Sequence, residues 1–268
     1  MREGRTSRGL WIRTGGSGKR LLVLLHGLGA NSSVWSGLIS RADREGNTRW
    51  AAPDLRGHGR SPYDGPYGYG MHAADIAALL EDEDPACVTV AGHSLGGVVA
   101  ALLGGGLFGP PPSRIAALGV KLSWSTDEVD RARQVAGRPS RSFASQAEAI
   151  QRYLKVSGLE GLVDPASEEA RLGSIGGEGG YGVAMDPRVF SAVGPSIVDI
   201  MGAVRVLMRL AAGSADPMVS ADEMRRFDPD PMIWPGLGHN AHRQDPETVW
   251  RFIDRVGIVA RSGPPPLG

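Results

Sequence analysis

The pentapeptide 92–96, GHSLG, places a serine between glycines at the spacing of a nucleophilic turn. An apolar run, 87–91, precedes it, and an apolar helical pattern, 95–103, follows it. A serine in such a strand-to-helix turn adopts strained backbone angles that expose its hydroxyl. Side chains two residues away would collide with the strand and helix, so glycine is needed there. The alternative is a tight turn around an unreactive serine, but this context favours Ser94 as a nucleophile.

A serine hydroxyl needs a base to take its proton and a carboxylate to orient that base. His239 lies in the glycine loop 235–239, after the apolar run 232–234, at the sheet edge where α/β proteins gather their sites. His242, three residues further on, is the competing candidate. We predict that His239 is the base.

The carboxylate is expected directly after the preceding strand. Asp216 follows the apolar run 204–211, and its alternative interpretation is an ordinary Asp-Pro turn. Asp127, after the strand that starts at Ile115, is a second candidate acid. The order Ser94, Asp216, His239 is the one used by α/β-hydrolase catalytic triads.

Two other glycine-rich segments follow strands. In 26–29, HGLG, the open loop would turn the Leu28 N–H inward to form an oxyanion hole with the Leu95 N–H, while His26 has a structural role. The segment 54–61, DLRGHGRS, is rich in polar side chains, but such a turn is typical of a scaffold loop tied by an Asp–Arg pair. We assign no catalysis to it.

Short apolar runs alternate with helical patterns, which predicts an α/β fold with a parallel sheet and helices on both faces. The predicted strands are 21–25, 49–52, 87–91, 115–120, 204–211 and 232–234. The predicted helices are 31–40, 71–83, 95–103 and 246–256.

The pattern changes in the middle of the chain. Strand signals vanish over 123–194, polar helical stretches such as 145–156 appear, and six of the ten residues 173–182 are glycine, which suggests a hinge or lid. We predict a discontinuous core (1–122 and 195–260), a helical cap (123–194) and a disordered tail (261–268).

Composition excludes several classes of protein. The net charge is zero, so no overall field attracts nucleic acid or an anionic membrane. The single cysteine, Cys87, excludes an internal disulfide framework and a cysteine-based zinc site. No signal peptide and no membrane-spanning run is recognisable. The sequence therefore predicts a cytoplasmic protein with no metal or organic cofactor and no nucleic-acid partner.

The segments HGLG, DLRGHGRS, GHSLGG, GSAD and GLGH occur in the order seen in one superfamily. Over about residues 8–122 and 196–257 the chain resembles the α/β-hydrolases, in their branch of small capped enzymes. The resemblance implies an eight-stranded, mostly parallel sheet, a helical cap after strand six and a Ser94–His239–Asp216 triad. Serine at 94 argues against the haloalkane dehalogenase and epoxide hydrolase branches, whose nucleophile is a carboxylate.

We expect hydrolysis of a small, largely apolar carboxylic ester or lactone through an acyl-enzyme. The alternatives are C–C bond hydrolysis of the meta-cleavage type, cofactor-free perhydrolysis and, in another class, a ligand receptor on this fold. C–C hydrolysis would need cap cations to hold a carboxylate, and the candidates are Arg131, Arg133, Arg138 and Arg141.

The substrate pocket is the least specified part of the prediction. Aromatic and apolar side chains near the predicted triad and in the cap could line it, although packing of the cap onto the sheet explains them equally well. The pocket candidates are Trp35, His93, Trp124, Tyr153 and Leu154.

Overall fold

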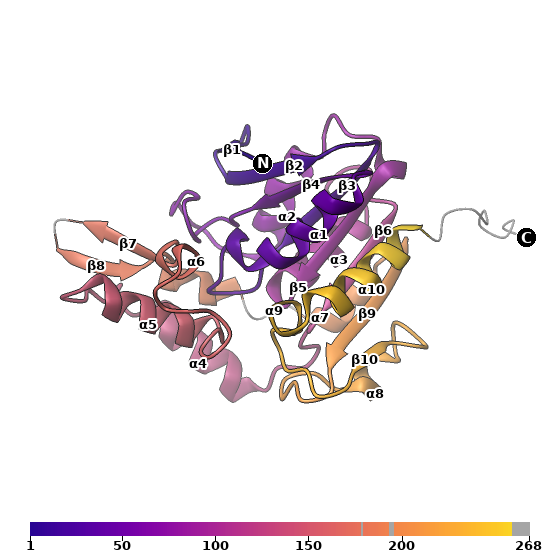
Figure 1. Cartoon of the computed structure of the whole chain (residues 1–268). Helices are drawn as coiled ribbons and strands as arrows, with labels where there is room; N and C mark the ends of the chain where they lie inside the picture. Colours follow the sequence, from indigo (N-terminus) through magenta and orange to yellow (C-terminus); the bar gives the residue numbers. More distant parts are fainter. Residues whose placement is uncertain (178, 193–195, 259–268) are drawn as a thin grey trace, which may run out of the picture.

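The computed structural model describes residues 1–177, 179–192 and 196–258, and within them the centre of the molecule is an eight-stranded sheet (Figure 1). The strand order is β1-β2-β4-β3-β5-β6-β9-β10, and of these eight only β2 runs against the others. The strands are β1 (Arg2–Arg5), β2 (Trp11–Gly16), β3 (Arg20–Leu25), β4 (Thr48–Pro53), β5 (Val88–His93), β6 (Arg114–Leu118), β9 (Leu207–Gly213) and β10 (Met232–Trp234). The predicted mostly parallel sheet is confirmed.

Helices cover both faces of this sheet, which explains the lack of polar alternation in β3. Leu21, Val23 and Leu25 pack into one apolar cluster, with side chains of α2, α3 and α7. Leu22 and Leu24 point the other way and pack with α1, α9 and α10. These helices, with the short α8, are α1 (Ser36–Glu45), α2 (Tyr69–Leu79), α3 (Leu95–Gly104), α7 (Ile197–Gly202), α8 (Ala221–Met224), α9 (Ala241–Gln244) and α10 (Pro246–Ile258). None of the helices in the described residues is both long and apolar enough to cross a membrane.

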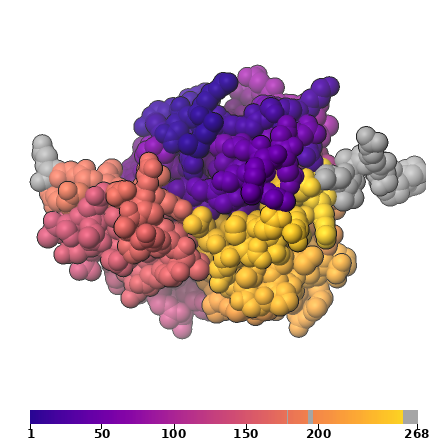
Figure 2. All heavy atoms as spheres, viewed as in Figure 1, coloured from indigo at the N-terminus to yellow at the C-terminus, as the bar shows by residue number. Residues whose placement is uncertain are grey.

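The segment 123–192, which we call the insert, separates the sixth and seventh strands of the sheet. It contains α4 (Thr126–Ala136), α5 (Gln146–Val156), α6 (Glu168–Arg171), β7 (Ser174–Gly177), β8 (Gly180–Val183) and a 3₁₀ helix (Pro187–Ala192). It forms a lobe beside the core (Figure 2). The glycine-rich stretch folds as the β7–β8 hairpin, so the insert is not purely helical as predicted. The predicted domain boundary at 194–195 and the predicted tail 261–268 lie outside the described residues.

The polar loop 54–61 has the scaffold role that its sequence suggests, but with a different pairing. The Asp54 carboxylate accepts hydrogen bonds from the backbone N–H groups of Ser32 (2.8 Å) and Arg60 (2.9 Å). The Arg56 guanidinium instead binds the carboxylates of Asp75 on α2 (2.8 Å) and Asp64 (2.9 Å). The Asp–Arg pair thus ties the loop to a helix rather than closing the loop on itself.

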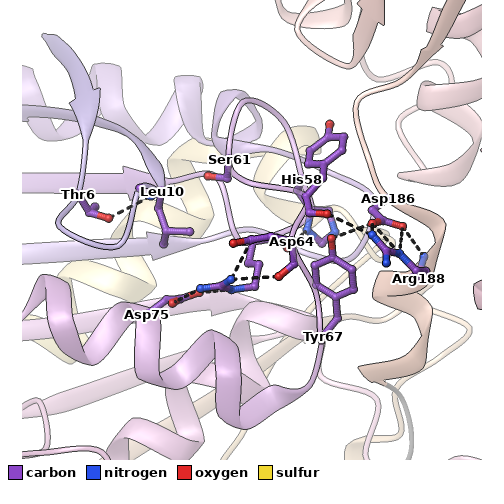
Figure 3. A network of polar contacts seen from close by, with 12 residues as sticks. Thr6, Leu10, His58, Ser61, Asp64, Tyr67, Asp75, Asp186 and Arg188 are labelled. Carbon is purple, nitrogen blue, oxygen red and sulfur yellow. Dashed lines mark hydrogen bonds and ion pairs between the residues drawn. The ribbon is translucent and has the colours of Figure 1, made fainter.

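The same loop holds the returning end of the insert. The Gly59 N–H donates to the Ala184 carbonyl (2.7 Å), and the Asp186 N–H donates to the Gly57 carbonyl (2.9 Å). Figure 3 shows Tyr67, Asp186 and Arg188 pointing toward one another; the Tyr67 hydroxyl donates to Asp186 Oδ2 over 2.8 Å. The loop 54–61 is therefore the fixed anchor of the insert on the core.

Asp75 and Asp64 offer a matched pair of substitutions for measuring how much the ion pairs of Arg56 stabilise the fold around the loop 54–61. Asp75 is almost fully buried, whereas the Asp64 side chain is 68% exposed. We expect Asp75→Ala to lower the free energy of unfolding by about 3–5 kcal/mol, because it leaves the Arg56 charge buried without its main partner. Asp64→Ala should cost about 1 kcal/mol or less, as for an exposed ion pair. Urea unfolding measures both, and equal losses would contradict this assignment.

Four of the six histidines are buried structural groups. Burial, as the largest cause, lowers the pKa of His26 to about 4 and of His58, His72 and His242 to about 3. His26 Nε2 accepts the Leu55 N–H over 2.8 Å, in line with its predicted structural role. The fold therefore contains several imidazoles that stay neutral at neutral pH.

These neutral histidines predict acid sensitivity. An unfolded histidine takes up a proton near its ordinary pKa of 6.5, while folded His72 stays neutral down to about pH 3, so stability is lost as the pH falls through this interval. Neither His72 ring nitrogen has a partner among the described residues. We expect His72→Leu to reduce the slope of unfolding free energy against pH by up to one proton, about 1.4 kcal/mol per pH unit. Urea unfolding from about pH 7 to 5 tests this; an unchanged slope would contradict it.

Candidate active site

Ser94 occupies a sharp turn between β5 and α3. Its φ of 50° is the one positive value of a non-glycine residue in the described chain. A Cβ on Gly92 would lie 2.1 Å from the Gly96 carbonyl oxygen, and a Cβ on Gly96 would lie 2.2 Å from the Leu25 carbonyl oxygen. The turn is thus the strained, glycine-dependent type that the sequence predicts, with the serine at its apex.

The structure brings Asp216 and His239 together at the ends of neighbouring strands. Asp216 follows β9 and His239 follows β10; His239 Nδ1 lies 2.8 Å from Asp216 Oδ2. The Asp216 side chain is completely buried, and its other oxygen accepts the Met218 N–H over 2.9 Å. Because a carboxylate accepts, the proton is on His239 Nδ1, which leaves Nε2 free to act as a base.

Close backbone packing brings these two loops to each other. A Cβ on Gly213 would lie 1.9 Å from the Leu237 carbonyl oxygen, so only glycine fits there. The Ala215 N–H donates to the same carbonyl over 2.9 Å. The loop after β10 is therefore held against the loop that carries Asp216.

The two competing candidates, His242 and Asp127, do not form the acid–base pair. His242 is buried with its ring 4.6 Å from the Trp35 ring, and neither of its nitrogens has a partner in the described part of the chain. Asp127 is exposed on α4. Neither residue therefore contacts the Asp216–His239 pair by hydrogen bond.

One cavity of about 580 Å³ joins Ser94, His239 and the two predicted oxyanion residues, Leu28 and Leu95. Within the described residues, neither the Leu28 nor the Leu95 N–H donates a hydrogen bond, so both amides are available. Ser94 Oγ also forms no hydrogen bond within the described residues. Catalytic hydrogen bonds are often long without substrate and tighten when it binds, so the geometry is compatible with a Ser94–His239 pair.

The rest of the cavity wall is mainly apolar and comes from both the core and the insert. Its apolar side chains include Tyr69, Trp124, Leu162, Phe190, Ile197 and Met218. Its charged side chains are Lys121, Lys155 and Glu160. Lys121 is paired with Glu128 and lies over the Trp124 ring, 4.7 Å from its centre. The lining therefore suits a small, largely apolar molecule.

Of the predicted pocket residues, His93 and Trp124 line this cavity, and three others do not. Trp35, Tyr153 and Leu154 are at most 1% exposed and belong to the hydrophobic core, which corrects the prediction. The side of α5 that carries Tyr153 and Leu154 packs against the core. The end of the helix and the turn after it, 155–158, face the cavity instead.

The arginines of the insert that were predicted to bind a substrate carboxylate do not lie at the cavity. All four are exposed, and none of them lines the cavity. These side chains are Arg131, Arg133, Arg138 and Arg141. The described residues likewise contain no group of three His, Cys, Asp or Glu side chains placed to hold a metal ion.

The sequence motifs did not indicate the role of Asn240. This residue connects the loop after β10 (residues 235–240, which carry His239 and which we call the base loop) to the insert. Its Nδ2 donates to the carbonyls of Ser157 (3.1 Å) and Gly158 (2.9 Å), just after α5, and the residue is 5% exposed. Its position next to His239 was the available signal. Its partners lie more than 80 residues away, and no local pattern identifies them.

Comparison with known proteins places this geometry in context. The chain is 34% identical over 162 residues to "Lipase LipV" of Mycobacterium tuberculosis. That match covers 60% of this chain and 59% of the lipase. This chain is also 38% identical over 91 residues to the pimeloyl-[acyl-carrier protein] methyl ester esterase of Edwardsiella ictaluri. That match covers 34% of this chain and 33% of the esterase. The chain thus spans less than two thirds of either relative.

Solved structures match over nearly the whole chain. The structure of E-2-(acetamidomethylene)succinate hydrolase superposes with a TM-score of 0.77 at 22% identity, covering 95% of this chain and 98% of that one. A thioesterase domain from the curacin biosynthetic pathway gives 0.78 at 16% identity, covering 95% and 99%. At these identities the likeness shows the fold.

The family model for the alpha/beta hydrolase family matches residues 22–252, a span that includes Ser94, Asp216 and His239. This match agrees with the sheet, the turn at Ser94 and the structural neighbours described above. The chain therefore belongs to the alpha/beta hydrolase family.

Proposed function

We propose that the chain is a serine hydrolase that cleaves a small, largely apolar carboxylic ester or lactone through an acyl-enzyme. The observation that carries the proposal is one cavity that holds the strained Ser94 and an Asp216-bound His239. This is the set of groups that acyl transfer needs: a nucleophile, a base and a carboxylate that orients the base.

In the proposed mechanism Ser94 Oγ attacks the carbonyl carbon while His239 Nε2 takes its proton. Asp216 holds the imidazole in the Nδ1–H tautomer and stabilises the imidazolium that forms. The Leu28 and Leu95 amides bind the oxyanion, and His239 then protonates the leaving alkoxide. In the second half His239 activates water, which releases the acid and restores Ser94.

The cavity supports an ester or lactone over C–C hydrolysis of a carboxylated substrate. Its wall is mainly apolar, and Lys121, one of its cations, is already paired with Glu128. The arginines that C–C hydrolysis of a carboxylated substrate was expected to use do not line it. The relatives named as a lipase and a methyl ester esterase point to ester chemistry in the same family.

Replacement of Ser94 is the direct test. We expect Ser94→Ala to lower kcat for a nitrophenyl ester by a factor on the order of 10⁶, as loss of the nucleophile does in other triads. Ser40→Ala, which removes an exposed hydroxyl from α1, is the matched control and should keep full activity. Steady-state assays with nitrophenyl acetate and butyrate measure both variants.

A fluorophosphonate probe tests whether Ser94 is an activated nucleophile, and turnover assays separate the remaining alternatives. The wild type should be labelled on Ser94, as mapped by peptide mass spectrometry, and Ser94→Ala should not be labelled. Most of the esterase activity remaining in Ser94→Ala would overturn the proposal. Turnover of a dienoate ring-fission product without ester cleavage would favour C–C hydrolysis. A burst followed by almost no turnover would favour a receptor.

A further inference from the structure

His93, the last residue of β5, lies at the meeting point of three loops. It is 4% exposed, and its ring centre is 4.6 Å from that of His239 and 4.5 Å from that of His242. Its Nε2 is 2.9 Å from the His239 carbonyl oxygen. A Cβ on Gly27 would lie 2.8 Å from His93 Nδ1, so the loop that carries Leu28 packs against the other side of the ring.

The hydrogen bond determines the state of this imidazole. A carbonyl oxygen only accepts, so the proton is on His93 Nε2. Burial, followed by the neighbouring His242 and His239, holds the pKa of His93 well below its usual value. The ring is therefore neutral at neutral pH, and it adds no positive charge that would oppose an imidazolium at His239.

The base loop has few other connections to the nucleophile. In the described part of the chain, the His93–His239 hydrogen bond is the one that joins the turn 92–96 to the loop 235–240. The other hydrogen bonds of this loop run to the loop that carries Asp216, to Trp234, to Arg243 and Gln244 of α9, and to the insert. The loop also contains Gly236 and Gly238, which give its backbone conformational freedom.

We propose that His93 is a positioning residue that holds the His239 carbonyl so that His239 Nε2 stays within reach of Ser94. The inference rests on the proposed function, because it assigns His93 a role in the same acyl transfer. Misplacement of a catalytic group by about 1 Å can cost on the order of 10²-fold in rate, so loss of one such bond has a measurable effect.

Three variants separate this role from simple packing. His93→Phe keeps the ring shape and removes the donor. His93→Gln places an amide N–H at the reach of the imidazole Nε2. His242→Phe is the matched control, because His242 is as deeply buried in the same cluster but donates to no described residue.

With nitrophenyl acetate we expect His93→Phe to lower kcat by about 10- to 100-fold while KM changes by less than about twofold. His93→Gln should return kcat to within about threefold of the wild type, and His242→Phe should leave it within about twofold. A wild-type kcat for His93→Phe, a loss expressed in KM, or an equal loss in His93→Gln or His242→Phe would overturn the inference.

Two further measurements keep the test decisive. If His93→Phe does not fold, His93→Asn replaces it, since its amide is too short to reach the carbonyl. It should be about 10- to 100-fold slower than His93→Gln, and equal rates would overturn the inference. Fluorophosphonate labelling of the wild type at Ser94 tests the proposed function separately. If the wild type is labelled and active while His93→Phe keeps the wild-type kcat, only the role of His93 is contradicted and the proposed function stands.

Discussion

The site depends on one backbone constraint, the positive φ of Ser94. Such a conformation costs on the order of 1–3 kcal/mol and persists only where the surroundings impose it. Here the Ser94 N–H donates to the Leu118 carbonyl at the end of β6 over 2.8 Å, and the carbonyls of Leu25 and Gly96 leave no room for side chains at Gly96 and Gly92. The turn directs the serine into the cavity and starts α3 directly behind it, where the Leu95 amide has no hydrogen-bond acceptor among the described residues.

Close backbone packing also brings the other groups of the proposed triad and oxyanion hole to this turn. Parallel strands end at one edge of the sheet, so the loops after β3, β5, β9 and β10 converge there. Backbone contact at Gly213 joins the acid and base loops, and the ring of His93 fills the space between the base loop and the loop that carries Leu28. Small residues thus let these loops approach closely, and one neutral imidazole occupies the gap that remains.

The insert divides its contacts between stability and the cavity. One end of it is fixed to the loop 54–61 by backbone hydrogen bonds, and to Tyr67 by the hydrogen bond to Asp186. Asn240 fixes the turn after α5 to the base loop. Residues 155–158, which include the two carbonyls that Asn240 binds, form a wall of the cavity. Changes in this wall can therefore alter the space in the cavity while Ser94, Asp216 and His239 stay on the core.

The sequence by itself determined the features that depend on local geometry. The strand–turn–helix around Ser94, the strands buried on both faces and the acid and base after consecutive strands are all encoded within a few residues, because close backbone contacts permit only certain side chains. It did not reveal β1 and β2, two short, partly exposed strands at one end of the sheet that contain no apolar run. Only the tertiary structure decided that Trp35 and the side of α5 that carries Tyr153 and Leu154 face the core, which removed these three residues from the pocket. It also decided the partners of Arg56, Asn240 and His93, since these contacts join residues that are far apart in the chain and depend on how the elements pack.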